Sequence, residues 1–232
     1  MATRWQRASA SAPGPLRLRN IDPAGTIDKQ HAVPAHPVVV QRGGRMQADQ
    51  AGHPKADSWE DRPLTERCIM GFNAGPPITP SAYNNNLQIV QTPTYLMIMT
   101  EMVHEARIIP LDGRPHGNLP RWTGDSRGHW EGDTLVVNTK NFKRETALTG
   151  SSATTTLVER FRRVDANTIA YDFTVTDPNM YTRPWSASMP LRAIDERVFE
   201  YACHEGNHGL EGILRGNRYR EKVEAEKAGE KK

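Results

Sequence analysis

Three short segments of the sequence carry the residue types that acid–base chemistry requires: a histidine and carboxylates close to it. A histidine suits proton transfer near neutral pH because its unperturbed pKa is about 6.5, and a neighbouring carboxylate can orient its ring. We therefore interpret the histidines as candidate proton carriers and the acids as candidate orienting groups. The candidate catalytic residues are Glu101, His104, Asp125, His204 and Glu205.

Each of these residues also has a structural interpretation. His104 could be an interior histidine with satisfied hydrogen bonds, and Asp125 could close a turn through its own backbone. On a strand, Glu101 and Arg107 would share one face and His104 would lie on the other. The run could therefore hold an ion pair rather than an active site.

The segment His204-Glu205-Gly206-Asn207-His208 matches the letters of the H-E-x-x-H zinc motif. Two histidines four residues apart bind zinc only when the segment is helical, with the glutamate as general base. Gly206 and Asn207 inside the motif, and a strand predicted just before it, argue against a helix. We therefore expect no metal. No phosphate loop or dinucleotide glycine pattern appears, so we also expect no organic cofactor.

A second set of residues could hold a ligand rather than react with it. Arginines could bind an anionic group, and aromatic rings could form the walls of a pocket. The same residues could instead plug one end of the fold. The candidate ligand-binding residues are Arg107, Trp122, Tyr181, Arg183 and Trp185.

Composition limits the classes of partner. A chain of 232 residues suits one medium domain with tails. The net charge of +3 is scattered, and no basic helix accompanies it, which argues against nucleic acid. No apolar run approaches the roughly 20 residues of a membrane helix. We expect a small-molecule ligand or substrate and leave the oligomeric state open.

The elements that must position these residues are short strands. Ile169, Tyr171, Phe173 and Val175 alternate with more polar residues, which indicates a strand with one buried face. Runs of this kind favour a mainly β fold: an antiparallel meander closing into a lipocalin-like barrel or a strongly curved sheet. The predicted strands are 87–91, 95–102, 104–111, 128–130, 134–142, 157–164, 168–176, 185–192 and 197–203.

The two ends of the chain differ from this middle. Residues 1–56 contain no Phe or Tyr, and Val38-Val39-Val40 is their one β-like piece, so we expect a disordered or non-native segment. A misplaced start or a frame error would give the same composition and would remove any export signal. Residues 209–228 can form one amphipathic helix. We therefore predict a β domain at 57–215 and a charged helical tail at 216–232.

The two cysteines, Cys68 and Cys203, lie far apart and have no C-x-x-C spacing. In an oxidising compartment they could form one bridge, which would constrain the unfolded chain by roughly 4–5 kcal/mol in the entropy model. They could equally be two buried thiols.

Four stretches together resemble a large uncharacterised family of exported β-rich proteins from soil bacteria, and the resemblance covers about residues 57–215. It implies a periplasmic or secreted location, with a signal peptide that is not seen in this chain. It also adds weight to a bridge between Cys68 and Cys203. The stretches are 83–93, 106–116, 124–142 and 200–207.

Three functions follow from these observations. The first is a periplasmic small-molecule enzyme of lyase, isomerase or hydrolase type, and the second is a lipocalin-like carrier of a small hydrophobic or aromatic ligand. The third is a structural or interaction domain. A cavity where His104, His204 and a carboxylate converge would favour the enzyme. An apolar cavity would favour the carrier, and a flat apolar patch without a cavity would favour the interaction domain.

Overall fold

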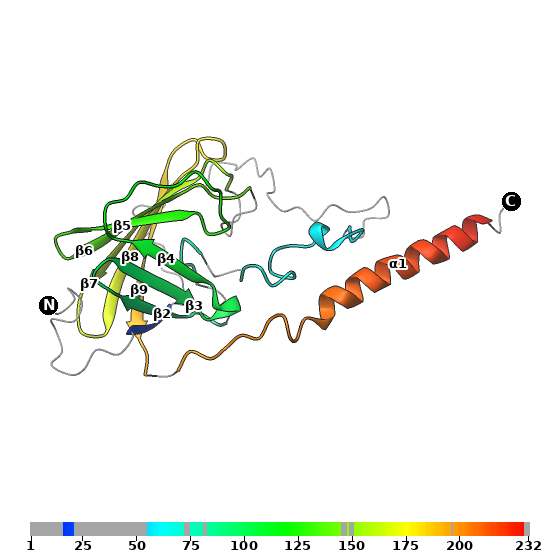
Figure 1. The fold of residues 1–232 in the computed structure, drawn as a ribbon, viewed down its shortest axis with the longest axis horizontal. Coiled ribbons are helices and arrows are strands. Elements are labelled where there is room, and N and C mark those ends of the chain that lie inside the picture. Colours follow the sequence, from blue (N-terminus) through cyan, green and yellow to red (C-terminus); the bar gives the residue numbers. More distant parts are fainter. Residues whose placement is uncertain are drawn as a thin grey trace.

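The computed structural model describes residues 16–20, 55–71, 75–80, 83–144, 148, 151–195 and 197–229. They form an antiparallel sheet and an arm that contains a long helix (Figure 1). The prediction of a mainly β meander with a C-terminal helix is confirmed.

Nine strands make up the sheet, in the order β4-β3-β2-β1-β9-β8-β7-β6-β5. β2 to β4 form a three-stranded meander and β5 to β9 a five-stranded one, and the backbone of β1 pairs with β2 and β9 between them. The strands are β1 (Leu16–Asn20), β2 (Asn86–Gln91), β3 (Tyr95–Thr100), β4 (Ala106–Pro110), β5 (Asp125–Glu131), β6 (Thr134–Lys140), β7 (Thr156–Arg163), β8 (Thr168–Thr176) and β9 (Trp185–Ala193).

β1 lies within the segment 1–56, where the sequence indicated only Val38-Val39-Val40 as β-like. Those three valines lie outside the described residues. The strand that the structure describes instead is Leu16–Asn20, which joins the two meanders through its backbone.

The sheet does not close into a barrel. Its edge strands β4 and β5 are both described in full, and no hydrogen-bonded ladder joins them. They approach through side chains: a Cβ added at Gly128 would lie 2.6 Å from Leu111 Cδ2 and 3.1 Å from Ile109 Cγ2. Side chains therefore occupy the seam where a backbone ladder would have to form. The sequence predicted a lipocalin-like barrel or a strongly curved sheet, and no closed barrel forms among the described strands, which make an open antiparallel sheet.

The core lies on the inner face of this sheet. In β8 the predicted buried face is confirmed, because Ile169, Tyr171, Phe173 and Val175 are each at most 2% exposed. Tyr171 and Phe173 continue an aromatic row with centroids 5.7 Å apart. Apolar residues of both meanders complete the same cluster, so one core holds the sheet together.

A charged network crosses this core. Arg107 on β4 and Glu159 on β7 form an ion pair of 2.8 Å, and both are almost fully buried. Tyr171 Oη donates to Glu159 Oε1 at 2.8 Å and accepts a hydrogen bond of 2.9 Å from the backbone N–H of Ile78. Burial, and then the negative charge of Glu159, raise the pKa of Tyr171 well above its usual value of 10.0. The loop at 75–80 therefore occupies part of the concave side of the sheet.

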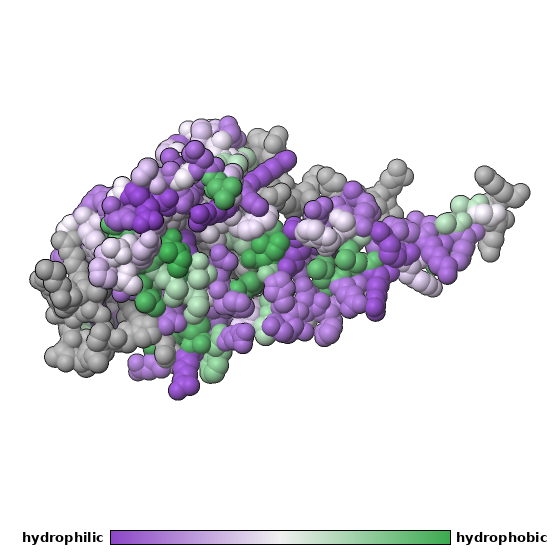
Figure 2. Space-filling view, viewed as in Figure 1, coloured by the Kyte–Doolittle hydropathy of each residue, from purple (hydrophilic) through white to green (hydrophobic). Residues whose placement is uncertain are grey.

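The outer face of β2 to β4 is partly apolar. Val90, Met97 and Ile108 form one cross-strand row, and Ile108 is 54% exposed. Figure 2 shows hydrophobic side chains over these strands and hydrophilic ones over β5 and β6. The outer surface is therefore partly apolar over β2 to β4 and hydrophilic over β5 and β6.

The arm comprises residues 55–70 and 197–229, and a disulfide fastens its two parts. The bridge between Cys68 and Cys203 is confirmed and spans 135 residues of sequence. Beside it, Asn207 Nδ2 donates to Glu66 O at 2.7 Å and Asn207 Oδ1 accepts from Leu210 N at 3.3 Å. Asn207 therefore links the bridge to the first turn of the helix.

The helix α1 spans His208–Gly229, so the boundary predicted at residue 215 falls inside it. The strand predicted at 197–203 is wrong. That segment has no strand partner in the described chain, because the disulfide and Asn207 bind it to residues 66–68 instead. None of the described helices has the length and apolar character of a membrane span.

We expect Glu159→Gln to destabilise the protein by about 3–5 kcal/mol, because it leaves the buried Arg107 without a counter-charge. Urea unfolding at neutral pH measures the change. Arg160→Ala is the control, since Arg160 pairs with Glu131 at the exposed surface and its removal should change little. Equal effects of the two substitutions would contradict a special role for the buried pair.

Replacing both Cys68 and Cys203 by serine should lower the free energy of unfolding by roughly 4–5 kcal/mol, because the unfolded chain loses a long loop constraint. Urea unfolding with and without a reductant measures this. The reduced wild type should match the double variant. A reductant that lowers the stability of the double variant as well would show that the effect does not come from the bridge.

Candidate functional site

The predicted catalytic histidines lie on exposed turns. His104 ends a short 3-10 turn, Met102–His104, between β3 and β4, where Val103 and His104 both have positive φ. His204 and Glu205 are exposed on the turn that precedes α1. The structure describes all three residues and records no contact between His104 and the other two, so it supplies no shared cavity for them.

Glu101 and Glu105 flank the turn of His104. Glu101 is half-buried, and its Oε2 atom is buried without a hydrogen-bond partner. Burial raises the pKa of Glu105, and the nearby His104 only partly offsets it. A carboxyl with a raised pKa is a candidate general acid, although sequence reasoning selected Glu101 and not Glu105.

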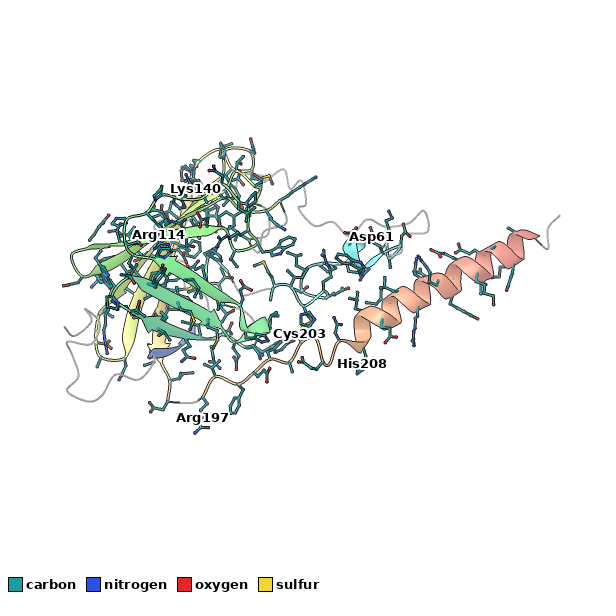
Figure 3. All side chains as sticks on the ribbon, viewed as in Figure 1. Asp61, Arg114, Lys140, Arg197, Cys203 and His208 are labelled. Atoms are coloured by element: carbon teal, nitrogen blue, oxygen red, sulfur yellow. A yellow bond between two sulfur atoms is a disulfide. The ribbon has the colours of Figure 1, made fainter. Side chains whose placement is uncertain are left out.

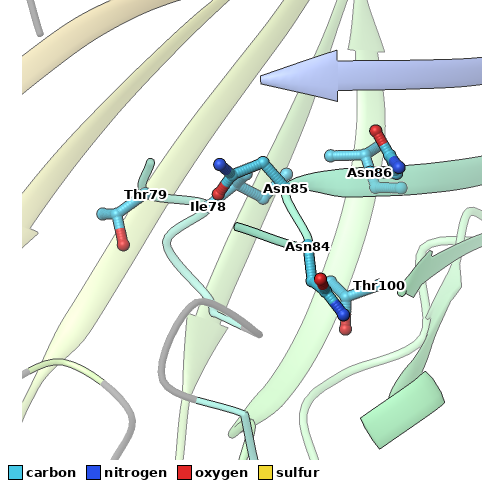
Figure 4. A pocket seen from close by; sticks show the side chains of 7 residues that line it. Ile78, Thr79, Asn84, Asn85, Asn86 and Thr100 are labelled. Carbon is cyan, nitrogen blue, oxygen red and sulfur yellow. The ribbon is translucent and has the colours of Figure 1, made fainter. Parts of the chain in front are cut away.

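A shallow hollow lies next to this turn, and its cavity volume is about 10 Å³. That is room for about one water molecule, whereas pockets for drug-sized ligands occupy about 300–1,000 Å³, so the hollow cannot enclose a ligand. We call it the asparagine hollow, and Figure 4 shows its polar side chains. Its lining is Ile78, Thr79, Asn84, Asn85, Asn86, Leu87 and Thr100.

The predicted ligand-binding residues divide into separate places. Arg107 is committed to Glu159 inside the core and cannot hold an external anion. Trp185 packs edge-on against Phe173 and Tyr181, at centroid distances of 5.6 and 6.1 Å, so it extends the core. Arg183 is exposed on the loop before β9. Only Trp122 lies beside other residues that could bind a ligand, as described below.

Asp125 does face a histidine, and that histidine is His116. Asp125 Oδ2 lies 3.4 Å from His116 Nδ1 and accepts a hydrogen bond of 2.8 Å from Gly117 N. Its other oxygen accepts one of 2.6 Å from Arg127. The sequence indicated Asp125 as a group that could orient a histidine. The structure places it beside His116, which sequence reasoning did not select because it lies nine residues away on a loop that folds back.

The charge state of this pair follows from its surroundings. Burial raises the pKa of Asp125, but the hydrogen bonds from Arg127 and Gly117 outweigh burial and hold the pKa below its usual value of 3.8. Asp125 is therefore a carboxylate at neutral pH. His116 Nδ1 is a buried atom that lies 3.4 Å from this carboxylate without forming a hydrogen bond, and the side chain of His116 is 18% exposed.

The loop that carries His116 is fastened on both sides. Arg127 Nε donates to Pro115 O at 2.9 Å, and Asn141 Nδ2 donates to Gly117 O at 2.5 Å. Asn141 follows the last residue of β6 and adopts a positive φ of 59°. Strand ends on both β5 and β6 therefore fix the position of His116.

A cluster of cations adjoins this loop. Arg121 N donates to Asn141 O at 3.0 Å and Lys143 N donates to Arg121 O at 2.8 Å, which brings residues 121 and 141–143 together. Lys143 Nζ lies 4.1 Å from the centroid of the Trp122 ring. Lys140 pairs in register with Asp125 and is labelled in Figure 3. We call this surface the basic face; it consists of Arg121, Trp122, Lys140, Lys143 and Arg144.

Among the residues that the structure describes, the cations of the basic face have no acidic partner. Within the described chain, none of its four cations forms an ion pair with a carboxylate. The nearest acid in the register, Asp125, is already neutralised by Arg127. The sequence did not predict this cluster, because its members come from two segments about 20 residues apart.

Asp177, at the end of β8, is a buried carboxylate with a structural role. It accepts hydrogen bonds from Ser152, Thr154 and Thr155 at 2.6 to 3.0 Å. Burial raises its pKa, but these bonds outweigh burial and lower it. Its oxygens are thus used to hold the loop before β7.

The H-E-x-x-H letters do not form the helical zinc motif. His208 is the first residue of α1, and His204 precedes the helix on a turn, so the two do not share a helical face. Across the described residues, no three His, Cys, Asp or Glu side chains gather as a metal site would need.

Comparison of the chain with known protein families, with curated proteins and with solved structures found no match. The resemblance to exported proteins of soil bacteria stays a prediction.

Asp125 should make stability depend on pH. Since its pKa is lowered in the folded protein, the ionised form stabilises the fold above about pH 4, and this contribution is lost as the pH falls through the lowered pKa. We expect Asp125→Asn to cost about 1–3 kcal/mol at neutral pH, because Arg127 and Gly117 lose a charged acceptor. The gap from wild type should shrink toward about pH 2.

Urea unfolding at several pH values measures both effects. Asp172→Asn is the control, because Asp172 is exposed on β8. A gap that stays constant between neutral and acid pH would show that the charge of Asp125 is not what stabilises the loop.

Proposed function

We propose that the β domain is a binding module that holds an acidic polysaccharide on its basic face, in a compartment outside the cytoplasm. Among the three functions considered from the sequence, this is closest to the interaction domain. The observation that carries the proposal is that backbone bonds hold Arg121 beside residues 141–143, where Lys143 Nζ lies 4.1 Å from the Trp122 ring. In the described chain, Arg121, Lys140, Lys143 and Arg144 form no ion pair with a carboxylate, and three of them are exposed.

The inner side of the sheet supports a surface function over a carrier. A lipocalin-like carrier needs a lumen for its ligand. Here the core contains an ion pair between Arg107 and Glu159. Tyr171 donates a hydrogen bond to Glu159 and accepts one from the backbone N–H of Ile78. The asparagine hollow is too shallow to replace such a lumen.

The charges of the basic face favour an anionic partner. Arg121, Lys140 and Arg144 are exposed, and Lys143 is half-buried against Trp122. Cations gathered on one surface attract and concentrate a polymer of opposite charge. Elsewhere on the sheet several cations are paired, for example Arg160 with Glu131, and contribute less to the field.

The polymer is best described as a uronate chain. Its carboxylates repeat along an extended backbone, which matches cations spread over two strand ends. An indole ring can also pack against a sugar ring, and Trp122 supplies one. The disulfide is typical of proteins in oxidising compartments, which supports a partner outside the cytoplasm.

We expect Lys140→Glu with Lys143→Glu to weaken binding to polygalacturonate at least about tenfold, which corresponds to about 1.4 kcal/mol. The matched control is Arg162→Glu with Arg192→Glu, which makes the same change in net charge. Arg162 pairs with the first residue of β6, six residues from Lys140 and so roughly 20 Å away along the strand.

Retention of each protein on immobilised polygalacturonate, at increasing salt, measures the affinity. Binding should fall as salt screens the charges, and a neutral dextran should not retain the protein. Equal loss in both double variants would mean that net charge alone drives retention, and tighter retention on DNA than on polygalacturonate would overturn the uronate assignment.

A further inference from the structure

We infer that His116 and Asp125 form an acid–base site that cleaves the bound uronate chain by β-elimination. This inference rests on the proposed function, because the basic face would have to deliver the polymer. It gives the protein a lyase activity in addition to binding.

The geometry places a carboxylate beside a candidate base. Asp125 Oδ2 lies 3.4 Å from His116 Nδ1, a buried atom that makes no hydrogen bond in this structure, and we assign Nε2 as the nitrogen that reaches the substrate. A contact of this length in a protein without substrate can shorten once substrate binds. Asp125 acts as a positioning residue: it fixes the ring and stabilises the imidazolium that forms.

The surroundings of His116 are rigid enough for this role. Gly117 is bonded through its N–H to Asp125 and through its carbonyl oxygen to Asn141. Arg127, which binds the other oxygen of Asp125, also holds Pro115. The residues on both sides of His116 are therefore tied to the ends of β5 and β6.

The basic face supplies the second requirement of elimination. The hydrogen on C5 of a uronate is acidified when the adjacent carboxylate is neutralised, because charge then spreads onto that group in the transition state. Lys140 pairs in register with Asp125, and Arg121 is bonded to the neighbouring Asn141. The backbone of two cationic residues is thus fixed at the strand ends that also hold the His116 loop, and we assign the carboxylate of the sugar to these cations.

The reaction balances without a cofactor. His116 Nε2 takes the proton from C5, and the electron pair of that C–H bond forms the C4–C5 double bond. The bond between C4 and the glycosidic oxygen breaks, and the leaving oxygen takes a proton from the imidazolium, which returns to its neutral form. The products are one chain with a new hydroxyl end and one with an unsaturated uronate end.

The test incubates the full chain with polygalacturonate and follows the ultraviolet absorbance of the conjugated double bond. His116→Gln should reduce the initial rate at least about a hundredfold, the typical contribution of a general base, and should leave retention on the polymer within about twofold. Circular dichroism checks that the variant is folded. His129→Gln is the matched control, because His129 lies on β5, exposed beside Glu131, and should keep the wild-type rate.

Asp125→Asn separates a positioning role from a structural one. We expect it to lower kcat while KM stays unchanged, because it impairs the base and not the binding surface. A rise in KM with unchanged kcat would overturn the role given to Asp125.

Four results would overturn the inference. If polymer binds to the wild type and no double bond forms, the lyase activity is refuted while the proposed binding function is retained. Chains that shorten without the double bond indicate hydrolysis instead of elimination. A fully active His116→Gln variant excludes His116, and the absence of binding to the wild type refutes both the inference and the proposed function.

Discussion

The buried pair of Arg107 and Glu159 is the interaction on which the rest of this structure depends. It joins β4 of the three-stranded meander to β7 of the five-stranded one, across a sheet whose edges do not close. Buried charges are costly unless they are paired and hydrogen-bonded, and Tyr171 helps to satisfy Glu159. Through Tyr171 the network also holds the backbone of Ile78. The concave side is consequently occupied by protein groups.

Because the inside is occupied, the chemistry that the described chain offers lies at strand ends and on loops. The ends of β5 and β6 are the richest place: they hold the His116 loop on one side and the basic face on the other. Gly124 marks the tight packing there, since a Cβ on it would lie 2.6 Å from Thr139 Cγ2. The site is thus built on backbone that has little freedom to move.

The strands could be predicted because their signal is local. Alternation in β8 and the turn residues between strands set the period and the breaks, and neither depends on distant contacts. Closure of the barrel could not be predicted, since it depends on whether side chains such as Leu111 fill the seam beside Gly128. The strand predicted at 197–203 failed for a related reason: a bond to Cys68, far away in sequence, replaced strand pairing.

The sequence by itself determined the β-rich architecture and the C-terminal helix, and it indicated Asp125 as a candidate orienting group. Periodicity and residue type allow this because both are local properties of the sequence. Only the tertiary structure decided that His116 is the partner of Asp125, that His104 and His204 lie on exposed turns, and that Arg107 belongs to the core. It also decided that Arg121 meets Lys143. These relations depend on sheet register and on a loop that folds back, and both are set by contacts between residues distant in the chain.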